Sequence, residues 1–164
     1  MDKKYLLDTN ILIDAHRRLY PFDIAPGFWD QLLDKASDRV VIIEKVNDEI
    51  MAGEDQLTNW YSENKSRFII RTIPDQPVMA AYTRIINSIN DSDMFKQAAK
   101  DEFASIADSW LCAYGLAYNY TIITNEIYKA NTRKRIPIPN ICREFNINYI
   151  DLLKFMREEG FIFR

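Results

Sequence analysis

The sequence has few of the residues on which zinc enzymes and nucleophilic hydrolases depend: one histidine, His16, and two cysteines, Cys112 and Cys142, among 164 residues. These three are too few and too scattered for a tetrahedral zinc site of the usual kind. Histidine-dependent catalysis would rest on His16 alone, which lies in a polar helical stretch and is expected at the surface. Glycine is scarce, at 4 residues, and neither a GxGxxG motif nor a Walker loop is present. The catalytic groups that remain are carboxylates, which number 24.

The chain also lacks long apolar runs, internal repeats and segments rich in glycine, serine or proline. We therefore expect no signal peptide and no membrane span, and a cytoplasmic protein in which residues 1–164 form a single domain. Because Cys112 lies in an apolar segment, both cysteines are interpreted as reduced thiols, which agrees with that location.

Positive charge is not in excess, since the net charge is -3 and the pI is about 5.2. These values argue against a protein that is held on nucleic acid by its overall charge. Nucleic acid would need a local basic patch, or a metal ion would have to offset an acidic pocket.

Short apolar segments alternate with helical patterns along the chain. Apolar runs without polar alternation are typical of strands that are buried on both faces of a parallel sheet. The expected strands cover residues 5–7, 39–43, 68–71, 121–124 and 148–150. One helix is expected to begin at residue 11, and others to cover residues 26–33, 45–52, 54–65, 78–89, 103–118 and 151–159. Residues 137–145 are expected to form a loop and a short helix. This order predicts an α/β fold, a three-layer α/β/α sandwich with a central parallel sheet.

Two carboxylates follow predicted strands. Asp8 ends the first strand, and Glu126 follows the strand at 121–124 by two residues. Because functional crevices of parallel sheets lie at the carboxyl ends of the strands, both side chains are expected at one edge of the sheet. For each of them, ordinary helix capping is the alternative role, and Thr9 and Asn10 are expected to cap the helix that follows.

Asp108 lies within the predicted helix 103–118, which is apolar almost all round. At 100° per residue, Asp108 shares a small, apolar face with Ala104, Leu111, Cys112 and Gly115, and that face suits close contact with a sheet. No lysine or arginine lies within helical reach on this segment. A buried carboxylate is costly without a partner, so Asp108 is a candidate functional residue. The alternatives are a partner from elsewhere in the chain, or a position near the start of a helix.

Glu49 is the fourth candidate, at the rim of the predicted helix 45–52, where Asp48 points to solvent. Glu44, at the end of the second strand, is the competing choice, and an ordinary surface charge is the alternative role of Glu49.

Several carboxylates in one pocket repel each other and are stable together mainly around a hard cation such as Mg²⁺ or Mn²⁺. Such an ion activates water and offsets phosphate charge, which is what a phosphodiesterase without histidine needs.

Four segments resemble the acidic motifs of PIN-domain proteins, in the same order and with similar spacing. They are Leu6–Leu12, Val46–Ile50, Ala107–Ala113 and Ile123–Glu126. The resemblance extends from Tyr5 to about Tyr149. The chain looks like a member of a stand-alone bacterial or archaeal branch of that superfamily. The chain departs from the family at the fourth motif, where Glu126 replaces the usual aspartate.

The resemblance implies an endoribonuclease that depends on Mg²⁺ or Mn²⁺, with Asp8, Glu49, Asp108 and Glu126 as catalytic and metal-binding residues. Many small members resemble VapC-type toxins, which implies an antitoxin protein and a homodimer as further partners. Thr9, Asn10, Thr124 and Asn125 would then orient carboxylates or waters, while helix capping is an equally good role for them.

The densest basic run, residues 129–135, follows Glu126 directly and is expected above the same edge of the sheet. Lys129, Arg133, Lys134 and Arg135 are the candidate contacts to RNA phosphates, with a solvated loop as the alternative. Tyr128 and Trp60 are candidates for stacking on bases, although burial is the expected role of Trp60.

Two other functions compete with the nuclease. One is a binding module for nucleic acid or protein, in which the fold persists but Glu126 or Glu49 fails to hold metal. The other is a metal-dependent phosphohydrolase that acts on small substrates. An enzyme of the haloacid-dehalogenase type needs a second aspartate two residues after the first, and Asn10 occupies that position.

Overall fold

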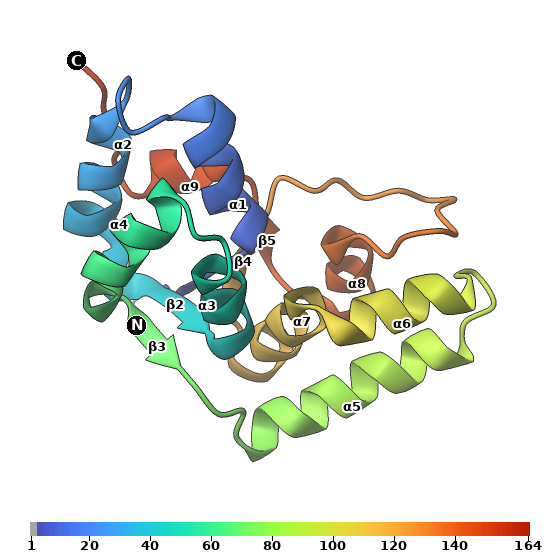
Figure 1. Cartoon of the computed structure of the whole chain (residues 1–164). Helices are drawn as coiled ribbons and strands as arrows, with labels where there is room; N and C mark the ends of the chain where they lie inside the picture. The colour runs from blue at the N-terminus through green and yellow to red at the C-terminus, as the bar shows by residue number, and fades with distance from the viewer. Residues whose placement is uncertain (1–2) are drawn as a thin grey trace.

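A parallel sheet of five strands forms the centre of the computed structural model, which describes residues 3–164 (Figure 1). The strands are β1 (Tyr5–Leu7), β2 (Val40–Ile43), β3 (Ile69–Arg71), β4 (Thr121–Ile123) and β5 (Tyr149–Ile150). Their order is β3-β2-β1-β4-β5, and each neighbouring pair is parallel. Every residue of β1, β2 and β4 is buried, because helices cover both faces of the sheet. The predicted α/β sandwich with a central parallel sheet is confirmed.

Helices connect the strands and form the two outer layers. They are α1 (Thr9–Asp14), α2 (Pro26–Gln31), α3 (Glu44–Met51), α4 (Gln56–Asn64), α5 (Gln76–Asp91), α6 (Gln97–Ser105), α7 (Ala107–Tyr118), α8 (Ile138–Phe145) and α9 (Leu152–Glu158). Both α1 and α2 continue as π-helical turns, at Ala15–Leu19 and Leu32–Ala36. Within residues 3–164, no helix has the length and apolar character needed to cross a membrane.

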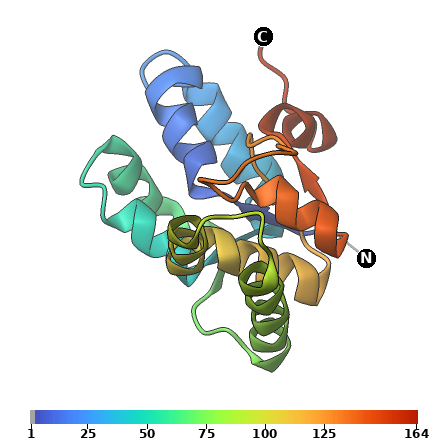
Figure 2. The ribbon, with the colours of Figure 1, turned by 90° about the vertical axis from the view of Figure 1, so that its right-hand side faces the viewer.

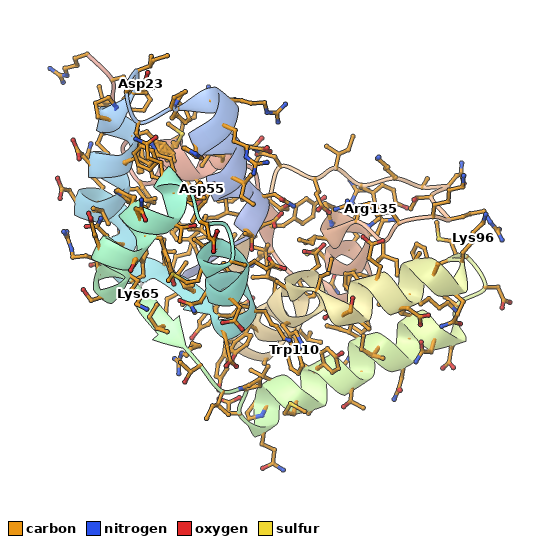
Figure 3. All side chains as sticks on the ribbon, in the orientation of Figure 1. Asp23, Asp55, Lys65, Lys96, Trp110 and Arg135 are labelled. Carbon is orange, nitrogen blue, oxygen red and sulfur yellow. The ribbon has the colours of Figure 1, made fainter. Side chains whose placement is uncertain are left out.

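The two layers differ in how they pack. On one face lie α1, α2 and α9, and on the other lie α5 to α8 (Figures 1 and 2). Aromatic contacts connect the first layer to its neighbours: Trp29 of α2 packs against Trp60 of α4, and Tyr5 of β1 packs against Phe155 of α9. In the second layer Tyr82 of α5 stacks on Trp110 of α7, at 4.0 Å between ring centroids (Figure 3). Trp60 of α4 is therefore half-buried, and its ring packs against the core.

The predicted helix 103–118 is two helices in the structure. Ile106, with φ of -109° and ψ of 176°, is extended and separates α6 from α7. The periodic pattern gives no sign of this break, because no glycine or proline lies near it. The break places Asp108 in the first turn of α7, where the helix dipole favours a negative charge. Asp108 therefore lies near the start of a helix, which was the alternative explanation for a carboxylate in this segment.

Strand order also decides where a site can form. Although β1 and β4 are neighbours, the chain continues from β1 to β2, toward one edge of the sheet, and from β4 to β5, toward the other edge. A crevice opens at the carboxyl ends of such a strand pair. The register pairs Leu7 with Ile123, so the residues that follow, Asp8 and Thr124, lie side by side at this crevice.

Helix α7 lies unusually close to the sheet at Gly115. A Cβ atom built on Gly115 would lie 2.7 Å from Cγ2 of Ile147 and 3.4 Å from Cδ1 of Ile122. Leu111 and Cys112, on the same side of the helix, are fully buried. The predicted small, apolar face of this helix is therefore confirmed for the residues that belong to α7.

We predict that Gly115→Ala lowers the free energy of unfolding. Overpacking of a tight core costs about 1–3 kcal/mol, which exceeds the gain of about 0.5–1 kcal/mol from replacing a helical glycine. Urea unfolding at neutral pH measures the difference. Gly27→Ala is the matched control, because the nearest atom to its added Cβ lies 3.9 Å away. A Gly115→Ala protein as stable as the wild type would contradict the close packing.

Candidate functional site

Asp8 lies at the carboxyl end of β1 and is only 2% exposed. It is the N-cap of α1, where one carboxylate oxygen, Oδ1, accepts the N–H of Asn10 at 3.2 Å. The other oxygen, Oδ2, accepts the hydroxyl of Thr124 at 2.9 Å. The cap was expected from Thr9 and Asn10, but Thr9 is already helical and Asp8 supplies the cap. Neither oxygen has a lysine or arginine at ion-pair distance within residues 3–164.

Asp108, in the first turn of α7, is 6% exposed and lines a small depression together with Arg135. Its carboxylate has no hydrogen bond and no ion pair among residues 3–164. Burial raises the pKa of Asp108 from 3.8 to about 8, and repulsion from Asp8, Glu126 and Glu49 adds to this effect. Asp108 is thus a buried acid whose charge lacks a direct partner in the described protein.

The same causes act on Asp8. Burial, followed by repulsion from Glu126, raises the pKa of Asp8 from 3.8 to about 6, against the opposing hydrogen bonds from Thr124 and Asn10. Glu49 raises this pKa as well. Asp8 and Asp108 are thus both repelled by Glu49 and Glu126, although only Asp8 and Glu126 line a common cavity.

Glu49 belongs to α3. Its Oε1 accepts the hydroxyl of Thr9 at 2.5 Å, and its Oε2 accepts the N–H of Ala107 at 3.5 Å. The carboxylate therefore lies at the N-terminus of α7, where the dipole stabilises a negative charge. Glu49 and the competing residue, Glu44, are both exposed, but Glu44 lines a different depression, with Lys45 and Trp110.

Glu126 is the member of the four that has a direct cationic partner. Its Oε2 accepts a hydrogen bond from Nη2 of Arg135 at 2.7 Å, and its Oε1 accepts the N–H of Ile138 at 2.9 Å. Arg135 lies on the irregular segment 124–137 that connects β4 to α8 (Figure 3). The guanidinium also lowers the pKa of Asp108.

A cavity of about 470 Å³ opens beside Asp8 and Glu126. Asn10 and Asp14 of α1 form one side of it, and Lys129, Thr132 and Arg135 of the connecting segment form the other. Asp14 was not expected at the site. Its spacing of four residues from Asn10 could have placed it on the same helix face, but the polar stretch that follows concealed this signal.

The predicted basic contacts divide into two groups. Lys129 and Arg135 line the cavity, whereas Arg133 and Lys134 are exposed and do not line it. The carbonyl of Arg133 accepts the N–H of Lys96, which attaches the segment to the start of α6 (Figure 3). The basic run thus reaches the cavity only through Lys129 and Arg135, and the contact of all four side chains with RNA phosphates stays a prediction.

The polar residues near the carboxylates also differ in role. Thr9 and Thr124 donate to Glu49 and Asp8, and Asn10 contacts Asp8 through its backbone. Asn125 instead accepts the N–H of Leu152 at 3.0 Å, so its side-chain oxygen contacts the first residue of α9. This contact agrees with the alternative role of satisfying a helix N–H, but the helix is α9, which lies far away in sequence.

His16 is less exposed than expected. Its side chain is 17% exposed, packs against Phe22, and lies with Nε2 4.0 Å from Oδ2 of Asp55. Its Nδ1 is buried without a hydrogen-bond partner among residues 3–164. The surface position predicted for His16 is therefore wrong, because a turn of π-helix directs the ring toward the aromatic layer.

Cys112 and Cys142 are buried free thiols.

The donor chemistry of the crevice fits a hard divalent cation. Residues 3–164 contain no group of three or more histidine, cysteine, aspartate or glutamate side chains placed to hold a metal ion. Mg²⁺ is usually bound by one or two carboxylates and retained waters. Asp8 and Asp108 are two such carboxylates, both buried and both without an ion-pair partner in this part of the chain.

We predict that the metal-free protein loses stability as pH rises from about 4 to about 8. Both folded pKa values lie above the ordinary 3.8, so the folded state binds more protons than the unfolded state in this window. A tenfold difference in proton affinity corresponds to about 1.4 kcal/mol. Urea unfolding in EDTA at several pH values measures the trend.

In Asp108→Asn, the amide does not titrate, so the decline of stability with pH should become shallower. Asp91→Asn, which changes an exposed carboxylate on α5, is the control and should leave the slope unchanged. Equal slopes for the wild type and Asp108→Asn would show that Asp108 does not carry the unfavourable buried charge.

Known structures share this fold. VapBC2 from Rickettsia felis, bound to a DNA fragment from its promoter, is 15% identical and has a TM-score of 0.54, over 90% of this chain and 97% of that chain. DNA-bound VapBC from Salmonella typhimurium is 14% identical and has a TM-score of 0.52, over 92% and 98%. At these identities the likeness shows the fold, and the expected PIN-like fold is confirmed. No curated protein matches the chain in sequence. Residues 5–163 match the model of the family described as a domain of unknown function (DUF4411), and the chain belongs to that family.

Proposed function

We propose that this protein is a metal-dependent ribonuclease of the PIN-domain type, and that residues 1–164 form one nuclease domain. The observation that carries the proposal is Asp108, a buried carboxylate without a direct partner in the described chain, beside the equally buried Asp8. A protein without a use for this charge would be more stable with an amide or an apolar side chain there.

The proposed cofactor is Mg²⁺ or Mn²⁺, with Asp8 and Asp108 as its carboxylate ligands and Glu49 and Glu126 as further acidic residues of the centre. When bound, such an ion supplies an activated water and offsets the charge of the phosphate under attack. Thr124 holds the Asp8 carboxylate in place, and Thr9 holds Glu49. These hydroxyl groups lower the cost of keeping the oxygens in a fixed orientation.

The proposed substrate is RNA, which enters the cavity next to Asp8. Lys129 and Arg135 line that cavity and are placed to contact phosphates that flank the cleaved bond. Arg135 is ion-paired with Glu126 in the protein alone. A phosphate would compete for this guanidinium, and Glu126 would then become available to the metal centre.

By likeness to the VapBC structures, we extend the proposal to the toxin of a toxin–antitoxin pair in the cytoplasm, with an antitoxin protein as partner. Homodimer formation belongs to the same proposal. Hydrolysis is expected to leave a 5′-phosphate and a 3′-hydroxyl.

A second candidate function is a binding module without catalysis. The ion pair between Glu126 and Arg135 favours it, because it occupies one of the four acidic side chains. The absence of a ready group of three metal-binding side chains among residues 3–164 favours it as well. The two functions differ in their response to divalent metal.

We predict that the wild-type protein cleaves RNA with Mn²⁺ or Mg²⁺ and not with EDTA, and that Asp108→Asn and Asp8→Asn each lose about 100-fold or more of this activity. The physical reason is the loss of an anionic ligand. Gel analysis of a labelled RNA measures the rates. Asp91→Asn, on the exposed surface of α5, is the matched control. Equal cleavage by all four proteins would identify the activity as a contaminant.

We predict that millimolar Mn²⁺ raises the Tm of the wild-type protein, because a ligand that binds only the folded state stabilises it. The increase should shrink in Asp108→Asn and persist in Asp91→Asn. Differential scanning fluorimetry measures all three. If the Tm of the wild type does not respond to metal, the binding module becomes the better description.

A further inference from the structure

A second cavity, of about 640 Å³, lies next to the carboxylate cavity. Three consecutive residues, Asn125, Glu126 and Ile127, line both cavities. The far wall of the second cavity comes from α8, β5 and the start of α9. A flexible chain that passes over residues 125–127 would therefore contact both cavities in succession.

The second cavity contains an arginine held in place by two aromatic side chains. The guanidinium carbon of Arg143 lies 4.0 Å from the ring centroid of Tyr128, and its Nε donates to the hydroxyl of Tyr149 at 3.3 Å. A stacked guanidinium keeps its outer N–H groups free for an anion, with less loss of side-chain entropy on binding. This arrangement is suited to a phosphate group.

The backbone that carries Tyr128 is also fixed. The side chain of Asn140, on α8, accepts the N–H of Lys129 at 3.0 Å and donates to the carbonyl of Lys129 at 2.8 Å. Because α8 also carries Arg143, the tyrosine and the arginine are held on one rigid unit. Tyr128 is nevertheless 39% exposed.

Acidic residues are in excess in the carboxylate cavity, whereas the second cavity is lined by two acidic and two basic residues. Arg143 and Lys154 both line it, and neither has an ion-pair partner in the part of the chain that the structure describes. Its two acidic residues are already engaged, since Asp151 accepts the N–H of Lys154 as the N-cap of α9 and Glu126 is paired with Arg135. An anion can therefore be bound here without displacing a carboxylate from Arg143.

We propose that the second cavity binds an unpaired nucleotide of the RNA substrate, on one side of the bond that is cut in the first cavity. Arg143 contacts the phosphate, and the base stacks on the Tyr128–Arg143 pair. Aromatic and guanidinium planes recognise bases that are not stacked within a helix. The substrate class is thus RNA that is single-stranded at this position, which deepens the proposed nuclease function and rests on it.

Binding of a fluorescent single-stranded RNA to the whole chain in EDTA tests the proposal, because no cleavage occurs there. Arg143→Gln and Tyr128→Leu are each expected to weaken the anisotropy Kd on the order of 10-fold, since one stacked base contributes about 1–3 kcal/mol. Tyr128→Phe, which keeps the ring, should bind like the wild type. Arg143→Gln should also make the slope of log K against the logarithm of the salt concentration shallower, by about the amount that one phosphate contact contributes.

The matched control is Arg84→Gln. Arg84 is also an exposed arginine over an aromatic ring, at 5.7 Å from the centroid of Phe145, but it lies on α5 and lines neither cavity. Its binding should equal that of the wild type. A Tm measurement on each variant separates lost binding from lost folding.

Wild-type affinity in folded Arg143→Gln and Tyr128→Leu would overturn the inference, as would a loss no greater than that of Arg84→Gln. Tighter binding of a fully paired RNA of the same sequence would overturn it as well. Failure of the nuclease function gives a different result: no cleavage with Mn²⁺, whatever the binding of these variants. With an active enzyme, Arg143→Gln should raise KM and leave kcat nearly unchanged.

Discussion

The burial of two carboxylates at one end of the sheet is the feature that most constrains this protein. Asp8 and Asp108 are almost inaccessible to solvent, come from elements far apart in sequence, and have no lysine or arginine at ion-pair distance in the described chain. Buried charges without a partner are among the costliest features of a folded protein. The raised pKa values of both groups express this cost. A divalent cation is the ligand that would relieve it.

The surrounding structure limits the cost without removing it. Thr124 and the N–H of Asn10 donate to Asp8, and the first turn of α7 holds Asp108 and Glu49 near the positive end of a helix dipole. Among these four carboxylates, only Glu126 has an ion pair with an arginine, within the part of the chain that the structure describes. Asp8 and Glu49 accept hydrogen bonds from neutral donors, whereas the charge of Glu126 is offset by Arg135.

The two cavities on either side of residues 125–127 differ in which charged groups are available. Acidic residues are in excess in the first cavity, whereas Arg143 and Lys154 have no ion-pair partner in the second, within the described residues. Under the proposed function, the overall charge of -3 does not oppose RNA binding, because unpaired basic groups line the second cavity. The second cavity could not be recognised from sequence, since Tyr128, Arg143 and Tyr149 belong to three different elements.

Local sequence is enough to predict the parallel sheet, since runs such as Val40–Ile43 have no polar alternation and must be covered on both faces. It also places Asp8 and Glu126 at strand ends, and these positions hold in the structure. The break at Ile106, the hydrogen bond from Leu152 of α9 to Asn125, and the positions of Arg133 and Lys134 outside the cavity depend on contacts between distant segments. Periodicity reports only which side of an element is apolar. The register of β1 on β4 and the approach of α7 decide which polar groups meet, because those choices are made by packing across more than 100 residues of chain.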